Sequence, residues 1–325
     1  MWNRRQLIAA GAASLAACVG APAIAQNFPN RAVTMVVPFP AGGITDAVAR
    51  ALASKMGEQL GKPVIVDNRP GGGGQIAAAY VRQQAADGHT LYVGATEMFA
   101  INPSLFRNFS YDPRKDFTPV TSLIASPLVL VVPANSSLTS VKELIAQAKS
   151  RKDGLNFASQ GMGSIGHLLG ETFRGKVGGK FNHVAYKGSA PALQDVMGGQ
   201  VDFMFDPVIT TAPLVAGKKL KPLAIAADKR SPQMPEVPTL AELGVSGVNA
   251  GVWFGAVVKT GTTAAVVERL NDAIHQAMKD PEVVKRFADQ GMQAFPSTPA
   301  QFGSFMQSEL TKWGPLVKAS GASIE

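Results

Sequence analysis

Cysteine and aromatic residues are scarce in this chain of 325 residues. It contains a single cysteine, Cys18, and its aromatic content is 7%. One thiol cannot form a disulfide within the chain, so the fold does not depend on a disulfide framework. The 31 basic and 23 acidic residues give a formal net charge of +8, but they are interspersed. A nucleic-acid-binding protein would cluster its basic residues among exposed aromatics, so the composition argues against a nucleic-acid partner.

The first 25 residues have the pattern of an export signal. Arg4 and Arg5 form a basic start, and residues 7–19 form a short apolar stretch. Ala25 ends an A-x-A cleavage pattern, which predicts a mature N-terminus at Gln26. The apolar stretch is too short and too rich in Ala and Gly for a membrane span. We therefore expect an exported, periplasmic protein.

Two details of this segment leave alternatives open. Residues 15–18, Leu-Ala-Ala-Cys, resemble the site at which lipoproteins are cleaved and lipidated, so Cys18 offers a second possible N-terminus. Residues 4–8 resemble a twin-arginine signal, so the export route is not decided. Cleavage after Ala25 would remove Cys18 and leave a chain without any thiol.

Beyond residue 33, short β-rich stretches alternate with amphipathic helical patterns. We expect strands at 33–37, 64–66, 91–94, 155–158, 183–186, 201–205 and 223–226. We expect helices at 44–60, 76–85, 165–175, 191–198, 208–217, 263–279, 281–290 and 298–319. Strands that are continuously apolar are typical of parallel sheets covered on both faces. The pattern predicts an α/β fold in which each half is a mostly parallel sheet flanked by helices.

Two further stretches, residues 126–133 and 251–258, are strand candidates outside this alternation. If the chain crosses to a second domain at the first stretch and returns at the second, the two strands form a hinge. After a signal peptide of residues 1–25, domain 1 would then comprise 26–128 and 252–325, and domain 2 would comprise 129–251.

Each half contains a glycine-rich turn between a strand and a helix. Residues 38–46 include Gly42 and Gly43, and residues 159–164 lead into the helix at 165. Such a turn leaves free backbone N–H groups at the positive end of a helix dipole, which favours an anion. Ordinary helix capping, here by Thr45 or Asp46, is the competing interpretation. Two such turns on two halves suggest a clamp around a small anionic ligand.

The second turn also matches a dinucleotide-binding pattern. Gly161, Gly163 and Gly166 have the G-x-G-x-x-G spacing after a predicted strand. That pattern requires an acidic residue at the end of the next strand to hold the ribose. Here that strand ends at Tyr186 and Lys187. Dinucleotide binding therefore remains a minor alternative.

An exported hydrolase is the second alternative. Ser164 and His167 are three residues apart, on one helix face. Neither Ser159 nor Ser164 lies in a G-x-S-x-G elbow, and no third group is evident that would orient a catalytic base. Asp206 follows a predicted strand and suits either ligand binding or capping of the next helix. The four histidines lack metal-ligand spacing, so no metal or cofactor is expected.

An ordered set of motifs resembles one family over residues 28–317. The chain is similar to the substrate-binding proteins of tripartite tricarboxylate transporters, also called Bug receptors. The resemblance rests on residues 36–46, 66–71, 86–91, 102–105, 161–167, 186–193, 199–202, 204–206, 237–239 and 253–255.

The resemblance implies a two-lobed periplasmic-binding-protein fold of type II with a Venus-flytrap motion. It implies a receptor rather than an enzyme, which hands a small organic acid to a membrane permease with one large and one small subunit. We expect a monomer. The ligand-binding residues carried over from the family are Phe39, Gly42, Gly43, Thr45, Thr96, Ser159, Gly163, Ser164 and Asp206.

The chain departs from the family after Thr96. Small or hydroxyl residues are common there, whereas this chain has Glu97, followed by Met98 and Phe99. Glu97 should border the distal end of the ligand, which argues against a second ligand carboxylate and leaves room for a monocarboxylate or a donor group. The loops expected to meet the ligand contain no Arg or Lys; they are residues 41–46, 95–99, 159–164 and 205–207. The carboxylate must therefore be held by backbone amides, hydroxyl groups and helix dipoles. A side chain at Gly163 would fill the space of that carboxylate.

Overall fold

The computed structural model describes residues 28–289 and 292–325. The predicted export signal, with Cys18 and the cleavage site at Gln26, lies outside these residues. Within the described ranges, no helix combines the length and apolar composition needed to cross a bilayer.

The strands form one ten-stranded sheet with two halves. Its order is β2-β1-β3-β9-β4-β7-β5-β6, and β10 and β8 also pair with β4. The strands are β1 (Val33–Val37), β2 (Val64–Asn68), β3 (Thr90–Ala95), β4 (Phe117–Pro133), β5 (Leu155–Ser159), β6 (Phe181–Ala185), β7 (Phe203–Pro207), β8 (Leu220–Ala226), β9 (Gly251–Lys259) and β10 (Gln293–Ala294). All seven strands predicted in the alternation are present, within a few residues of their expected bounds.

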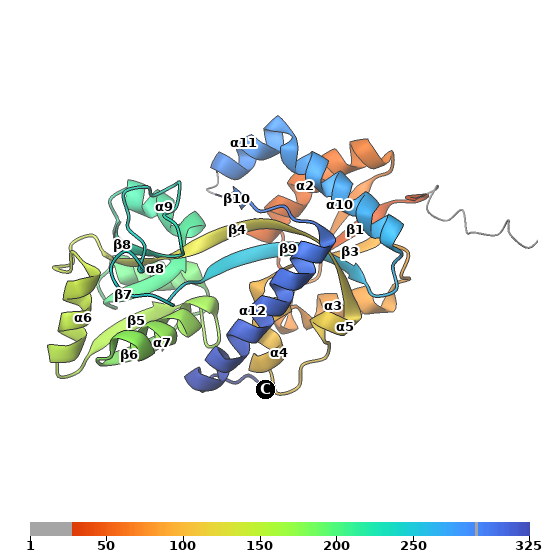
Figure 1. Cartoon of the computed structure of the whole chain (residues 1–325). Helices are drawn as coiled ribbons and strands as arrows, with labels where there is room; N and C mark the ends of the chain where they lie inside the picture. Colours follow the sequence, from red (N-terminus) through yellow and green to blue (C-terminus); the bar gives the residue numbers. More distant parts are fainter. Residues whose placement is uncertain (1–27, 290–291) are drawn as a thin grey trace, which may run out of the picture.

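β4 carries the chain from one half of the sheet to the other. Its first part pairs with β9, from Phe117 opposite Lys259 to Pro127 opposite Gly251. From Leu128 onward its partners are β7 and β8. Figure 1 shows β4 and β9 running side by side between the two halves. The two predicted crossover strands are therefore confirmed, although β4 begins nine residues before the predicted stretch at 126.

Both halves are mixed sheets. The strands that alternate with helices are parallel to one another: β1 with β2 and β3, and β5 with β6 and β7. The crossover strands pair antiparallel to their neighbours, as do β8 and β10. Two strands that pass between the lobes in opposite directions must be antiparallel to each other. This explains why neither half of the sheet is parallel throughout.

Helices flank the sheet on both sides of the crossover. The first lobe contains α2 (Ile44–Leu60), α3 (Gln75–Gln83), α4 (Asn102–Leu105), α5 (Pro113–Asp116), α10 (Ala264–Lys279), α11 (Pro281–Asp289) and α12 (Pro299–Ser320). The second lobe contains α6 (Val141–Ser150), α7 (Ile165–Val177), α8 (Ser189–Met197) and α9 (Val208–Ala216). A 3-10 turn, η3 (Gly72–Gly74), precedes α3, and a π-helical turn, η4 (Glu97–Ile101), follows β3.

Local sequence signals explain where several helices begin and end. Gly61 is left-handed (φ 65°) and closes α2, which ends at residue 60 as the predicted helix does. α6 was not predicted, although Ser140 and Glu143 form a recognisable start signal. The Ser140 hydroxyl accepts from the Glu143 amide, and the Glu143 carboxylate accepts from the amide of Thr139.

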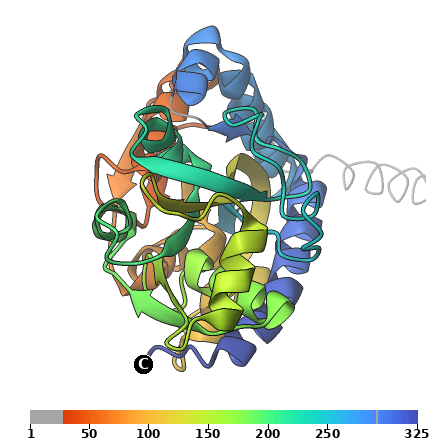
Figure 2. The same ribbon diagram turned by 90° about the vertical axis from the view of Figure 1, so that its left-hand side faces the viewer.

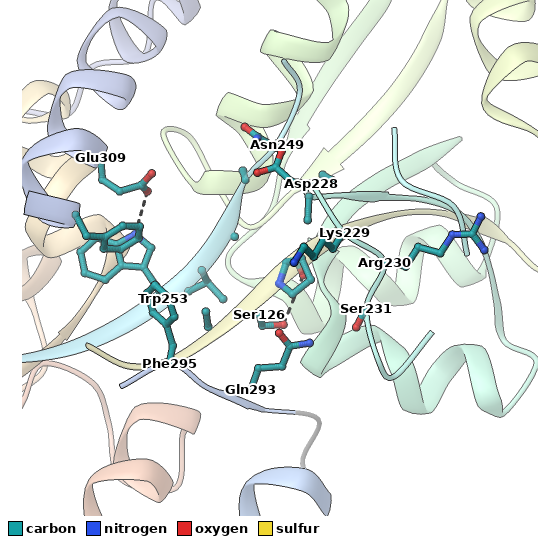
Figure 3. A pocket seen from close by; sticks show the side chains of 18 of the residues that line it. Ser126, Asp228, Lys229, Arg230, Ser231, Asn249, Trp253, Gln293, Phe295 and Glu309 are labelled. Atoms are coloured by element: carbon teal, nitrogen blue, oxygen red, sulfur yellow. Dashed lines mark hydrogen bonds between the residues drawn. The ribbon is translucent and has the colours of Figure 1, made fainter. Parts of the chain in front are cut away.

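α12 fastens the first lobe to the crossover. It crosses the front of the molecule in Figure 1 and lies along the right-hand side in Figure 2, and it contacts β4, η4 and α7. On this helix the carboxylate of Glu309 is buried and accepts hydrogen bonds from the indole nitrogens of Trp253 in β9 and Trp313, each at 2.9 Å. The contact with Trp253 is visible in Figure 3. One carboxylate thus satisfies two buried donors and ties a helix to a crossover strand.

Replacing this carboxylate should destabilise the fold. Glu309→Leu leaves two buried indole N–H groups without acceptors, so the free energy of unfolding should fall by about 2–5 kcal/mol. Glu309→Gln retains a carbonyl acceptor and should cost clearly less. Urea denaturation of the two variants tests this. Equal losses for Leu and Gln would show that the indole hydrogen bonds do not determine the stability.

Candidate functional site

A cavity of about 640 Å³ lies between the two lobes, over the crossover strands. This volume is within the usual range for sites that bind small molecules. The first lobe contributes the starts of α2 and η4, the second lobe contributes the turn before α7, and Val252 and Phe254 of β9 also line the cavity. Its wall is largely apolar. Of the nine predicted site residues, five line this cavity, namely Phe39, Gly43, Thr45, Gly163 and Ser164.

The start of α2 faces this cavity with its amides uncapped. Gly43 occupies the N-cap position and provides no side-chain hydrogen bond. The amides of Ile44 and Thr45 belong to the first turn, which has no acceptors within the helix. Because the positive end of the helix dipole lies at the same place, this helix start can accept an anion.

Asp46 is turned away from the cavity. Its carboxylate accepts from the amide of Gly42 at 2.9 Å and from Asn68, and it pairs with Arg50 at 2.9 Å. The hydrogen bonds from Arg50, followed by those from Gly42 and Asn68, lower the pKa of Asp46 to about 2 against a smaller opposing effect of burial. The predicted structural role of Asp46 is supported. Gly42 does not line the cavity, and its amide is held by Asp46.

The turn before α7 lies across the cavity and is partly engaged internally. Ser164 caps the helix, since its hydroxyl accepts from the amide of His167 at 3.3 Å. The amide of Gly163 donates to Nδ1 of His167 at 3.0 Å, so this amide is not free for a ligand. The amide of Ile165, in the first turn, remains available at the positive end of the helix.

Gly163 marks the place where the two lobes meet. It is left-handed (φ 74°), and a Cβ atom there would lie 2.5 Å from Cδ2 of Leu105 in the first lobe. The prediction that a side chain at Gly163 would displace the ligand carboxylate therefore needs correction. The added atom would first collide with Leu105 and hold the lobes apart.

Asp206 lies behind the cavity wall. It is fully buried and accepts hydrogen bonds from Gln160 at 2.6 Å, from Ser189 at 2.7 Å and from Thr210. Burial raises the pKa of Asp206 to about 6, against the opposing effect of these three donors. Gln160, Ser189 and Thr210 all line the cavity. In this structure Asp206 therefore positions three cavity residues and does not itself line the cavity.

Thr96 and Ser159 also lie behind the wall, and both are fully buried. The Thr96 hydroxyl accepts from the amide of Trp253 at 2.8 Å and lies 3.3 Å from its carbonyl oxygen, which ties the end of β3 to β9. The Ser159 hydroxyl accepts from the amide of Gly161 at 3.1 Å and lies 2.6 Å from Nε2 of His183. Both residues shape the turns that reach the cavity.

Several cavity residues are not among the nine predicted site residues, and Leu105, Gln160, Ser189 and Thr210 are examples. Ser189 and Thr210 follow the carboxyl ends of β6 and β7, where ligands bind in open α/β sheets, so position alone could have indicated them. Leu105 carries no chemical signal, because only the meeting of the lobes places it there.

The geometry does not support the two enzymatic alternatives. Ser164 contacts the backbone of His167, not its imidazole, so the two do not form a nucleophile and base. Gly166 packs closely against the backbone of β7, since a Cβ atom there would lie 2.6 Å from the carbonyl oxygen of Phe205. The glycine spacing that suggested a dinucleotide thus has a packing explanation within the second lobe.

A second hollow, of about 400 Å³, lies on the other side of the crossover strands, between α12 and the segment after β8. Figure 3 shows Asp228, Lys229, Arg230 and Glu309 around it. Its polar groups carry both signs of charge. Helix starts of two lobes converge at the larger cavity, which we therefore regard as the site.

Comparisons with known proteins agree with this geometry. The sequence profile described as "Tripartite tricarboxylate transporter family receptor" matches residues 48–322. The chain belongs to the tripartite tricarboxylate transporter receptor family. The protein BugT of Bordetella pertussis is 37% identical over 308 residues, which cover 94% of each chain.

Solved structures of this receptor family share the fold. An R. palustris protein solved with adipate has a TM-score of 0.79 at 34% identity, covering 91% of this chain and 99% of its own. MatC from Rhodopseudomonas palustris, solved with bound malate, has a TM-score of 0.75 at 35% identity, covering 89% and 100%. The predicted family and the two-lobed periplasmic-binding-protein fold are confirmed. The family is one of solute-binding receptors.

Protonation of His167 should destabilise the receptor in acid. Burial, together with His183 and Arg174, lowers the pKa of His167 from 6.5 to about 4. The unfolded chain therefore takes up this proton at a higher pH than the folded chain, and stability falls as pH falls from 6.5 towards 4. The loss from this group should reach about 3 kcal/mol, since one pKa unit corresponds to about 1.4 kcal/mol.

Urea denaturation at a series of pH values measures this loss. His167→Gln keeps an acceptor for the amide of Gly163 but cannot take up the proton, so its stability should depend less steeply on pH in this range. An equally steep dependence in the variant would assign the effect to other groups.

A methyl group at Gly163 should weaken ligand binding by at least about tenfold, equivalent to about 1.4 kcal/mol. Gly163→Ala would collide with Leu105 and oppose lobe closure. Gly199→Ala is a matched control, because Gly199 has nearly the same backbone angle (φ 70°) but open space around its Cβ position. Calorimetry on both variants, and on Gly163→Ala combined with Leu105→Ala, separates collision from backbone strain. Similar binding by Gly163→Ala and Gly199→Ala would contradict the collision.

Proposed function

We propose that this chain is an exported receptor that encloses a small organic carboxylate between its two lobes. The observation that carries the proposal is the cavity, where the start of α2 on one lobe and the start of α7 on the other converge. Its described lining residues include no Lys, Arg or His. A carboxylate bound there would be held by backbone amides, hydroxyl groups and helix dipoles.

The relatives support this ligand class. Adipate and malate, bound to the two solved relatives, are both small carboxylates. As a member of the receptor family, the protein would deliver its ligand to a permease with a large and a small membrane subunit. The periplasmic location, the cleavage before Gln26 and the monomeric state belong to the same proposal.

The proposed binding residues fall into two groups. Phe39, Gly43, Thr45, Gly163 and Ser164 would border the ligand directly. Gly42, Thr96, Ser159 and Asp206 would hold the turns and side chains around it.

We further propose that the lobes move as two bodies, with residues 26–128 and 252–325 forming one and residues 129–251 the other. The change of partner along β4 at Leu128 supports this division. Neither lobe alone encloses a ligand, so binding should be accompanied by closure. Small-angle scattering should show a more compact particle at saturating ligand than without it.

We expect no turnover of esters or amides, since Ser164 and His167 are engaged with backbone groups.

The negative charge of the ligand should be essential. Replacing the carboxylate of a bound ligand by a primary amide removes hydrogen bonds to a charged group, which are worth about 1.5–3 kcal/mol each. Affinity should fall by at least about tenfold. Salt should change it little, because fixed dipoles in an enclosed site are screened less than exposed charges.

Calorimetry with an acid and its amide, at low and high salt, tests the proposal. A thermal-shift screen of organic acids first identifies a ligand, since binding to the folded state raises the unfolding temperature. Equal affinity for acid and amide would contradict recognition by helix starts.

A further inference from the structure

Among the residues that the structure describes, none offers a side-chain partner to the carboxyl group of Glu97. Glu97 is the first residue of η4 and lines the cavity. It directly follows Thr96, which the two contacts with Trp253 hold in place, so the backbone that carries Glu97 is fixed. Glu97 is therefore held at the cavity by a fixed segment of backbone.

No cation balances this carboxyl group. Among residues 28–289 and 292–325, those lining the cavity include no Lys, Arg or His, and the hydrogen bond to Glu97 comes from its own amide. Burial among protein atoms raises the pKa of Glu97, although part of its surface is open to the cavity. A buried carboxylate is costly unless it is paired. An ionised Glu97 therefore needs a partner among the contents of the cavity.

The second lobe adds acceptors on the same cavity. The hydroxyl groups of Ser189 and Thr210 both point a donor towards Asp206. When Asp206 is ionised and accepts these two hydrogen bonds, the hydroxyl oxygens can act only as acceptors towards the cavity. Glu97, Ser189 and Thr210 thus all offer acceptors to a donor on the ligand.

We propose that the ligand is an amino acid in the general chemical sense, with a carboxylate at the helix starts and a protonated amine that pairs with Glu97. The inference deepens the proposed function and rests on it. A second ligand carboxylate would meet Glu97 as a like charge and could bind only if one of the two groups took up a proton. Glu97 is then the residue that selects aminated acids over dicarboxylates.

A matched set of compounds tests this selection on the mature chain. Hexanoate, 6-aminohexanoate, 2-aminohexanoate, 6-hydroxyhexanoate and adipate share a six-carbon frame, and the four- and five-carbon sets cover shorter ligands. At pH 7.5, calorimetry should show one aminated acid bound at least about tenfold more tightly than the plain acid, with the dicarboxylate weakest.

Glu97→Gln should reverse this order. The amine should lose at least about tenfold in affinity, the plain acid should change little and the dicarboxylate should gain. Glu268→Gln is the charge-matched control, because Glu268 is exposed on α10 and absent from the cavity lining. It should leave every affinity unchanged.

Three results would overturn the inference without touching the proposed function. These are tighter binding of adipate than of both amines, equal binding of the hydroxy acid and the best amine, or an unchanged order in Glu97→Gln. If no acid of any class binds, the proposed function fails together with the inference.

Discussion

The pairing of β4 with β9 is the constraint on which the remainder of the structure depends. These two strands join the lobes, so they largely set how the helix starts that line the cavity lie relative to each other. The contact of α12 with α7 and the approach of Leu105 to Gly163 add to this link. Both strands are also anchored sideways. The backbone amide of Trp253 donates a hydrogen bond to Thr96, and its indole nitrogen donates one to Glu309. One residue thus connects the end of β3, β9 and α12. A displacement at Trp253 would therefore reach the cavity through η4 on one side and α12 on the other.

Several polar groups next to the two helix starts are satisfied by the protein itself, whereas the first-turn amides are not. The carboxylate of Asp46 accepts a hydrogen bond from the amide of Gly42 and pairs with Arg50. The Ser164 hydroxyl accepts from the amide of His167, and the His167 ring accepts from the amide of Gly163. These contacts prevent an acidic side chain of the first turn from occupying the place of an external anion. They also fix the turns before a ligand arrives, which reduces the entropy that binding must overcome.

The sequence was sufficient for the parts of the fold that have a local signal. Apolar periodicity and glycine termini located the alternating strands and the long helices, and the motif order identified the family. β4 was placed too short, because Pro119 and the polar residues near Thr121 interrupt its pattern, and the register indeed shifts there. The π-helical turn at Glu97 was not predicted, because such turns are rare and the residues there show no pattern that sets them apart from an ordinary helix. The site was predicted less completely, since Asp206, Thr96 and Ser159 were correctly placed near strand ends but lie one layer behind the wall, and burial depth depends on tertiary packing.

Glu97 also bears on how closure is coupled to the ligand. If the lobes move as proposed, closure on an empty cavity would remove water from an ionised Glu97 without giving it a partner, which would disfavour the closed state. A ligand with a donor removes this cost in the closed state alone, because only there does the second lobe exclude water from the site. A ligand shifts a conformational equilibrium only by its difference in affinity for the two states. On the proposed pairing, the charge of Glu97 increases that difference, so the residue that selects the ligand would also limit closure without one.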